Sequence, residues 1–217
     1  QCGEMSLAHN GVLFLDEAAE FKASVLQMLR VPLENGNICL SRAGRSTVYP
    51  AKFQLIMATN PCPCGNLGSK DKLCLCSAKS VGNYWRKFSA PLVDRIGIRF
   101  DCNAEDEGKA HTLEELREMV SRAFERQMRR QGKRNQWLDP QEISEFCKMT
   151  DEAKGALDDA TDSLGFSPRA VANVLKIART LADMHEAEEQ ETIGEKHIAD
   201  ALKLRGELPE IARYVCE

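Results

Sequence analysis

The chain has 217 residues and a hydrophobic content of 43%, which is enough to bury the core of one large domain or two small ones. Its formal net charge is −4. The chain therefore lacks a general basic field, and any contact with nucleic acid must come from a local patch. The sequence contains neither an apolar run of about 18 residues nor a leader pattern, so we expect a cytoplasmic protein with no membrane contact.

The first informative stretch is Gly11–Glu17, in which four consecutive apolar residues, Val12 to Leu15, precede two acids. An unbroken apolar run is typical of a strand buried on both faces of a parallel sheet. Asp16 and Glu17 then lie at the carboxyl edge of the sheet, where open α/β folds bind ligands. One carboxylate can hold Mg2+ through its hydration shell while the other polarises a water for attack on a phosphate, as in a Walker-B motif. The alternative is that both acids only stabilise the start of the next helix.

A helix is predicted over residues 21–34, with Pro32 bending or restarting it. Two β-prone runs around a short glycine-containing turn then predict a hairpin, with strands at 38–42 and 46–49. Arg42 and Arg45 lie at the tip of this hairpin. They are either solvated, as exposed charges usually are, or in contact with a phosphate backbone.

A second buried strand is predicted over residues 53–59, and Asn60 follows it directly. If the two buried strands are neighbours in the sheet, Asn60 lies beside the acidic pair. Its amide can then orient the attacking water near the γ-phosphate of a nucleotide.

The chain contains nine cysteines, an odd number, and four of them are clustered. This pattern favours a metal over disulfides. The cluster consists of two C-x-C pairs, Cys62 with Cys64 and Cys74 with Cys76. Together the pairs can supply four thiolates to one tetrahedral Zn2+. The alternative is a set of free buried thiols or redox-active thiols.

Asp94 and Arg95 directly precede a predicted strand over residues 96–100. The two side chains either form only an ion pair or have a catalytic purpose. In the second case Arg95 projects toward the phosphates of a neighbouring subunit as an arginine finger and neutralises charge in the transition state.

Beyond about Glu105 the chain is charged, poor in strands and helical in its periodicity. Thr112 and Glu115 form a capping box for a helix to about Arg130, with an apolar face of Leu113, Leu116, Val120, Ala123 and Phe124. A basic cluster lies at its end and is interpreted as a solvated helix end, with a nucleic-acid patch as the alternative: Arg126, Arg129, Arg130, Lys133 and Arg134. Three further helices are predicted at 140–149, 151–164 and 195–204.

Ser167 and Pro168 begin another helix, as the N-cap and the first helical residue. Arg169 therefore lies in the first turn, where backbone N–H groups already favour an anion. A cation is poorly placed there for helix stability, and a phosphate ligand would explain it.

The phosphate-binding pattern G-x-x-x-x-G-K-[ST] is absent from the sequence, and residue 1 is Gln. We therefore expect a piece of a longer protein, in which the phosphate-binding loop lies upstream of residue 1. The 217 residues alone are then expected to be inactive.

The ordered set of motifs resembles the magnesium-chelatase-like AAA+ ATPases, and within them the ComM/YifB proteins. Three stretches carry the resemblance, namely residues 3–17, 60–65 and 91–96. It implies an α/β fold in which a partial AAA+ core with a parallel sheet, residues 1–104, contains the Cys-rich loop 62–76. A helical lid domain, residues 105–217, follows. The resemblance assigns Walker B to Asp16 and Glu17, sensor 1 to Asn60, the arginine finger to Arg95 and sensor 2 to Arg169.

The resemblance also implies a homo-oligomeric, hexameric ring that binds ATP and Mg2+ between subunits. The hairpin is similar to one that points into the pore toward DNA in related helicases. We expect a motor that couples ATP hydrolysis to DNA remodelling, of the helicase or branch-migration type, in competence or recombination. The alternatives are the motor subunit of a metal-insertion chelatase and a non-enzymatic, zinc-stabilised interaction module.

Overall fold

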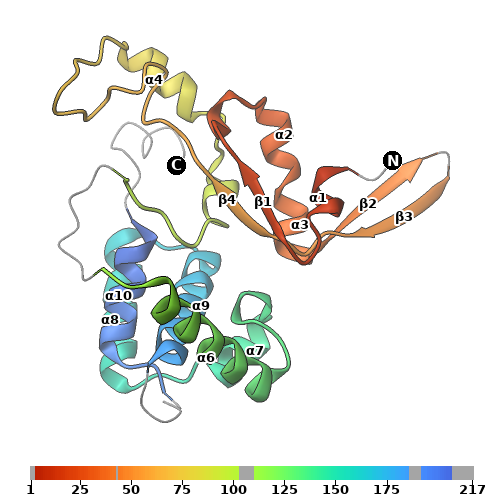
Figure 1. Cartoon of the computed structure of the whole chain (residues 1–217), viewed down its shortest axis with the longest axis vertical. Helices are drawn as coiled ribbons and strands as arrows, with labels where there is room; N and C mark the ends of the chain where they lie inside the picture. The colour runs from red at the N-terminus through yellow and green to blue at the C-terminus, as the bar shows by residue number, and fades with distance from the viewer. Residues whose placement is uncertain (1–2, 43, 103–109, 186–191, 207–217) are drawn as a thin grey trace. The chain divides into compact units, whose positions relative to one another are not determined.

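The computed structural model describes residues 3–42, 44–102, 110–185 and 192–206, without the side chain of Arg42 (Figure 1). The chain divides between Ile96 and Gly97 into two compact units. The first combines a small parallel sheet with helices, and the second is helical. The predicted boundary at residues 104 and 105 lies outside the described residues. Among the described helices, none has the length and apolar character that a membrane crossing requires.

The sheet of the first unit consists of β1 (Val12–Leu15) and β4 (Gln54–Met57), which pair in parallel. Their register places Leu15 opposite Met57, so the carboxyl ends of both strands lie at the same edge. The two predicted buried strands are thus neighbours. The short helix α1 (Glu4–Leu7) precedes β1.

The expectation that β1 is buried on both faces is wrong for the described residues. Val12 and Phe14 are more than half exposed, at 55% and 57%, whereas Leu13 and Leu15 pack against the core. The apolar side chains therefore alternate between an exposed and a packed face. The described residues build a core against one face of the sheet only.

The helix predicted over 21–34 forms two helices, α2 (Ala23–Met28) and α3 (Arg30–Asn35), after a 3-10 turn η1 (Ala18–Glu20). Pro32 explains the division, since its missing N–H is tolerated only in the first turn of a helix and α3 begins two residues before it. Gly36 ends α3 in the left-handed conformation, with a φ of 67°.

The predicted hairpin is confirmed. Strands β2 (Asn37–Arg42) and β3 (Arg45–Pro50) pair antiparallel, and the arm projects away from the β1–β4 sheet of the same unit (Figure 1). Gly44 adopts a φ of 75° in the turn, which suits a residue without a Cβ.

Two helices complete the first unit, α4 (Ala78–Trp85) and α5 (Ala90–Val93). Aromatic residues of the α4 region, Tyr84, Trp85 and Phe88, lie in the core with Leu26 and Leu29 of the α2–α3 pair. The strand predicted over 96–100 is wrong, because these residues are not in a strand. The amide of Arg99 instead donates to the carbonyl of Leu204 at a helix end, so no sheet partner extends this segment.

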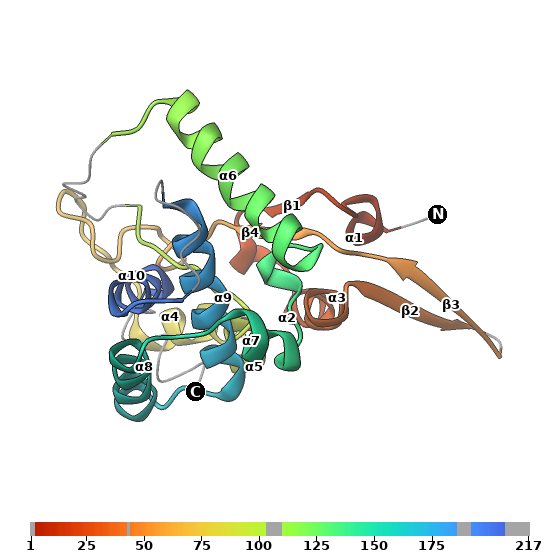
Figure 2. The ribbon, with the colours of Figure 1, turned by 90° about the horizontal axis from the view of Figure 1, so that it is seen from below.

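The second unit is a bundle around α9 (Pro168–Met184), which packs against α6, α7 and α10 (Figure 2). Its other members are α6 (Leu113–Gln131), η2 (Asn135–Trp137), α7 (Pro140–Phe146), α8 (Asp151–Leu164) and α10 (Glu195–Arg205). Sequence signals for its helix starts are confirmed. Thr112 and Glu115 form the capping box of α6, and Ser167 caps α9 through the amide of Ala170.

The predicted apolar face of α6 is mostly exposed. Leu113, Leu116 and Val120 are exposed, and Ala123 is the member that is buried. Two polar residues three and four positions after Ala123 are buried as well, namely Arg126 and Gln127. The helix thus joins the bundle through its C-terminal half.

The basic cluster at the end of α6 is only partly the solvated helix end that we expected, because Arg129 and Arg134 are exposed whereas Arg126 and Arg130 contact α9. Arg126 is buried and donates to the carbonyl oxygens of Asp183 and His185. Arg130 forms two hydrogen bonds to the Asp183 carboxylate, at 2.7 and 2.9 Å. The arginines therefore join α6 to the end of α9.

Candidate ATPase site and cysteine cluster

The strand ends of the sheet bring Asp16, Glu17 and Asn60 to one edge. The amide of Ala58 donates to the carbonyl of Leu15 at 2.9 Å, and the amide of Ala18 donates to the carbonyl of Ala58 at 2.8 Å. These bonds continue the parallel pairing past both strands, so the acidic pair follows β1 beside the segment that leads to Asn60. All three side chains are exposed and accessible to a ligand.

Glu17 has an unusual backbone conformation, with φ 47° and ψ 46° in the left-handed region. For a residue with a Cβ this conformation costs about 1–2 kcal/mol, and such strain is concentrated at functional sites. The Glu17 amide donates to Oδ1 of Asp16 at 3.0 Å. Glu17 is the N-cap residue of η1, but its side chain accepts no capping hydrogen bond. Helix capping therefore does not account for this glutamate.

Asn60 begins the loop that carries the cysteine cluster. Gly65 of this loop turns back toward it, because a Cβ built on Gly65 would lie 3.8 Å from Cγ of Asn60. Tyr84 and Trp85 of α4 bond the residues on either side of Asn60. Sequence analysis missed both aromatic residues, since no motif or spacing relates them to residue 60.

Arg95 lies against its own unit. Its guanidinium donates to the carbonyl of Pro91 and forms an ion pair with Glu34. The Arg95 side chain is 9% exposed, and its buried Nε finds no hydrogen-bond partner among the described residues. The guanidinium thus retains a free donor beside a carboxylate that is itself 45% exposed.

Arg169 is exposed in the first turn of α9, directly after the Ser167 cap and Pro168. The first turn of α9 contains no acidic residue of its own. This is the location that the sequence predicts for Arg169. The role of Arg169 toward a nucleotide stays a prediction.

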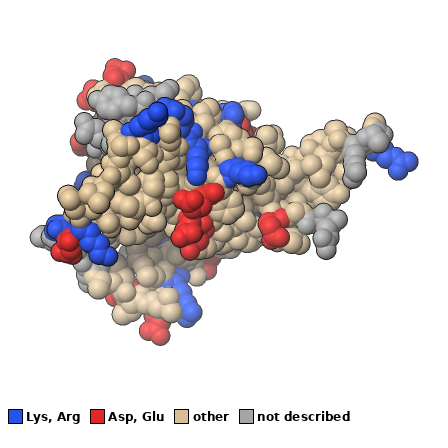
Figure 3. Space-filling model, turned by 90° about the horizontal axis from the view of Figure 1, so that it is seen from above, with Lys and Arg blue, Asp and Glu red and all other residues tan. Residues whose placement is uncertain are grey.

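The hairpin register pairs Arg42 with Arg45 across the end of the arm. Arg45 is exposed, and the side chain of Arg42 lies outside the described part. Figure 3 shows acidic and basic side chains interspersed on the face it presents, with basic atoms at the end of the projecting arm. Of the two paired arginines, the described side chain at the hairpin tip is therefore that of Arg45.

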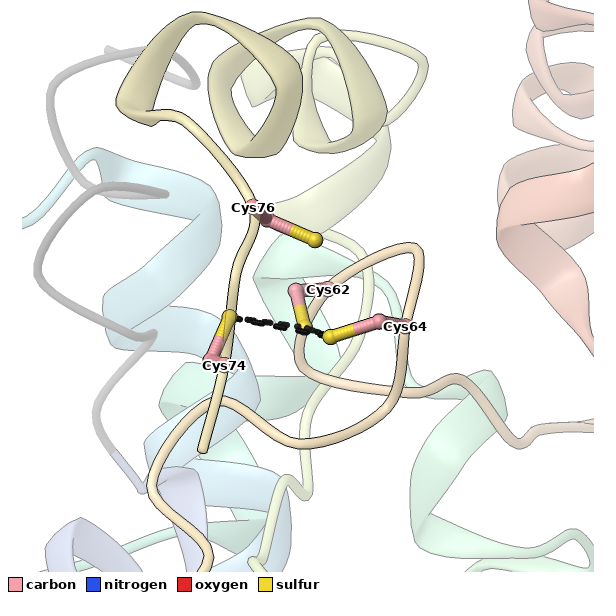
Figure 4. Close-up of side chains that lie close together, drawn as sticks. All are labelled: Cys62, Cys64, Cys74 and Cys76. Atoms are coloured by element: carbon pink, nitrogen blue, oxygen red, sulfur yellow. Dashed lines mark hydrogen bonds between the residues drawn. The ribbon is translucent and has the colours of Figure 1, made fainter. Parts of the chain in front are cut away.

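The four clustered cysteines converge. Cys62, Cys64, Cys74 and Cys76 place their sulfur atoms within 4.8 Å of one another (Figure 4). The Sγ of Cys62 lies 3.4 Å from that of Cys64 and 3.7 Å from that of Cys74. A tetrahedral site with zinc–sulfur bonds of about 2.3 Å has sulfur–sulfur edges of about 3.8 Å. The donor set therefore fits a four-thiolate metal site.

The thiols of this cluster also perturb one another. Burial opposes ionisation of Cys62, but hydrogen bonds from Cys64, Cys74 and nearby backbone amides outweigh it and lower its pKa to about 6. The interaction with the Cys64 side chain is the main cause that raises the pKa of Cys76 to about 12. Once one thiol of the cluster has ionised, its neighbours lose their protons less readily. A bound cation would favour the ionisation of all of them.

Comparisons with known proteins agree over nearly the whole chain. Residues 1–110 match the family described as magnesium chelatase, subunit ChlI, and residues 110–205 match magnesium chelatase, subunit ChlI C-terminal. The chain is 39% identical over 211 residues to competence protein ComM of Haemophilus influenzae, and 38% identical over 211 residues to the uncharacterized protein YifB of Escherichia coli. These alignments cover 94% of this chain and 40% of each relative, so the chain spans less than half of their length.

Proposed function

The chain belongs to the magnesium chelatase ChlI family, and we propose that it carries the carboxylate, sensor and arginine residues of an AAA+ ATPase site. The single observation that carries this proposal is the shared edge of β1 and β4. There the strained Glu17 follows Asp16, and both lie beside the segment of Asn60. Such an edge is where open α/β sheets bind ligands.

Asp16 and Glu17 divide the chemistry between them in this proposal. When bound, Mg2+ neutralises charge on the phosphates of ATP, and the Asp16 carboxylate holds it through its hydration shell. The Glu17 carboxylate accepts a hydrogen bond from the attacking water and polarises it. Asn60 orients the same water through its amide.

In this proposal Arg95 and Arg169 neutralise charge that develops on the transferred phosphoryl group. We propose that Arg95 acts on ATP held by a neighbouring subunit of a hexameric ring, exchanging its Glu34 carboxylate for a phosphate. Arg169 acts as sensor 2 from the first turn of α9. Such a site also needs a phosphate-binding loop, whose sequence pattern does not occur in the 217 residues.

We further propose that the four cysteines hold Zn2+ as a structural site. The argument is the match between their sulfur spacing and a thiolate tetrahedron. All four ligands come from protein side chains, which is typical of closed structural sites. The site stabilises the loop between Asn60 and α4.

The substrate that fits the hairpin is DNA. Two arginines at paired backbone positions, Arg42 and Arg45, bring positive charge to the end of the arm, which favours an anionic partner such as a phosphate backbone. The motor couples hydrolysis to helicase or branch-migration remodelling, and the name of the Haemophilus relative, competence protein, points to competence. Two alternatives remain, a chelatase-type motor for metal insertion and a non-enzymatic zinc-stabilised module.

The experiment that tests this function measures ATP turnover of the full-length protein with and without single-stranded or branched DNA. We expect DNA to raise turnover, and the double variant Arg42→Ala/Arg45→Ala to lose that stimulation while keeping basal turnover. Arg117→Ala, which removes an exposed arginine of α6, is the matched control. Turnover that is indifferent to DNA would favour the chelatase-type motor, and no turnover at all would favour the non-enzymatic module.

A further inference from the structure

The end of helix α4 forms hydrogen bonds to the residues on both sides of Asn60. The hydroxyl of Tyr84 lies 3.1 Å from Oγ1 of Thr59, within hydrogen-bond distance. The indole Nε1 of Trp85 donates to the carbonyl of Pro61 at 3.0 Å. Adjacent residues of one helix therefore fix the residues directly before and after Asn60.

The same region also reaches the segment that follows the acidic pair. The ammonium of Lys87 donates to the carbonyl of Ala19, which lies in η1 two residues after Glu17 and is fully buried. The ammonium lies 5.9 Å from the centre of the Tyr84 ring. One short stretch, residues 84–87, thus contacts both the segment that carries Asn60 and the segment that follows Glu17.

Tyr84 and Trp85 are themselves fixed by burial in the core. Tyr84 and Trp85 are 6% and 7% exposed, and the Trp85 ring packs 5.5 Å from that of Phe88. Burial raises the pKa of the Tyr84 phenol, against the lowering effect of Thr59 and the Asn60 amide. The hydroxyl therefore stays protonated at neutral pH and keeps its hydrogen bond.

We propose that Tyr84, Trp85 and Lys87 are positioning residues that hold Asn60 and Glu17 in register for attack on the phosphate. The inference rests on the proposed ATPase function. Each of the three residues acts through a backbone segment or a neighbouring side chain. A displacement of about 1 Å at a reacting group can lower the rate about a hundredfold, so contacts that fix the position of Asn60 and Glu17 preserve the rate of hydrolysis.

A positioning role predicts a specific kinetic signature. The water-orienting groups act on the chemical step, whereas ATP affinity comes mainly from the phosphate-binding loop. In the full-length protein we therefore expect Tyr84→Phe and Trp85→Phe to lower kcat by about tenfold, with KM for ATP within about twofold of wild type. Trp137→Phe, the same change at the other tryptophan of the chain, should leave both constants unaltered.

Thr59 gives a second test that does not disturb the core, because its side chain is exposed. Thr59→Val removes the hydroxyl and keeps the shape, whereas Thr59→Ser keeps the hydroxyl. We expect Thr59→Val to match the loss in Tyr84→Phe, the pair of changes together to cost no more than either alone, and Thr59→Ser to retain wild-type kcat. Additive losses would show that the two hydroxyls do not act through one hydrogen bond, and would overturn this part of the proposal.

The variant Glu17→Gln separates the assignment of the ATPase site from the positioning role of Tyr84 and Trp85. If Glu17→Gln keeps its turnover, the ATPase site itself is misassigned. If Glu17→Gln loses turnover while Tyr84→Phe, Trp85→Phe and Thr59→Val keep wild-type kcat, the ATPase site stands and the positioning role is overturned.

Discussion

Among the residues of the candidate site, Glu17 has the most unusual backbone conformation. Its left-handed backbone is a conformation that glycine would adopt at little cost, and yet a glutamate occupies it. Its side chain forms no capping hydrogen bond that would offset the energetic cost of this conformation. A carboxylate held in this conformation directly after a strand is consistent with selection for chemistry over stability.

A glycine at this position separates the two requirements. We expect Glu17→Gly to raise the free energy of unfolding by about 1 kcal/mol, because the left-handed conformation no longer costs energy, while ATP turnover is lost. Chemical denaturation of the full-length protein measures the first effect. Glu20→Gly, three residues later in the same 3-10 turn, is the control and should destabilise the fold. A Glu17→Gly protein that is less stable than wild type would contradict the strain argument.

At the scale of elements, the second unit depends on one buried carboxylate. Asp183 of α9 is 1% exposed and accepts hydrogen bonds from Arg130, Arg179 and Asn135. Burial opposes its ionisation, but the Arg130 hydrogen bonds and the nearby Arg179 charge outweigh burial and lower the pKa of Asp183 below its ordinary value. This network connects α6, η2 and α9.

We expect Asp183→Asn to lower the free energy of unfolding by about 3 kcal/mol at pH 7, because it leaves two arginines without their buried anion. A carboxylate with a lowered pKa stabilises the fold above its unfolded pKa of about 3.9, and this contribution is lost as the pH falls through the folded pKa. The difference between variant and wild type should therefore shrink in acid. Asp158→Asn, an exposed change on α8, is the control. An equal difference at pH 7 and pH 3 would contradict the linkage.

The cysteine loop is the second element with a test of its own. We expect the purified protein to contain about one zinc per chain by elemental analysis, and Cys64→Ser, Cys74→Ser and Cys76→Ser each to lose it. Cys39→Ser changes a cysteine of the hairpin that lies outside the cluster and should keep the metal. Zinc retained in all three cluster variants would exclude the four-thiolate site.

Local sequence signals predicted where helices, strands and turns form, but they predicted less well which side chains are buried or exposed. The caps at Thr112 and Ser167, the hairpin and the two adjacent strands depend on nearby residues, so the sequence alone indicates them. The exposed face of β1 and the buried arginines of α6 depend on which distant side chains reach them, and periodicity does not contain that information. The convergence of the four cysteines was predicted from spacing, whereas the contacts of Tyr84 and Trp85 were not.

At the scale of the whole molecule, the proposed ring requires Arg95 to serve a site in another subunit. We expect Arg95→Ala and Glu17→Gln each to abolish turnover alone, and their mixture to recover part of it. In mixed rings an intact Arg95 from one variant meets an intact Glu17 from the other. Co-purification of differently tagged subunits establishes that mixing has occurred. Mixed rings with no recovery would place Arg95 in its own subunit's site.

If the edge formed by β1 and β4 carries the carboxylates of an ATPase site, the variant Glu17→Gln of the full-length protein should bind ATP without hydrolysing it. We predict that ATP binding stays within about twofold of wild type while turnover falls at least about a hundredfold, since the amide cannot polarise the attacking water. Turnover near the wild-type rate in the variant would contradict the account.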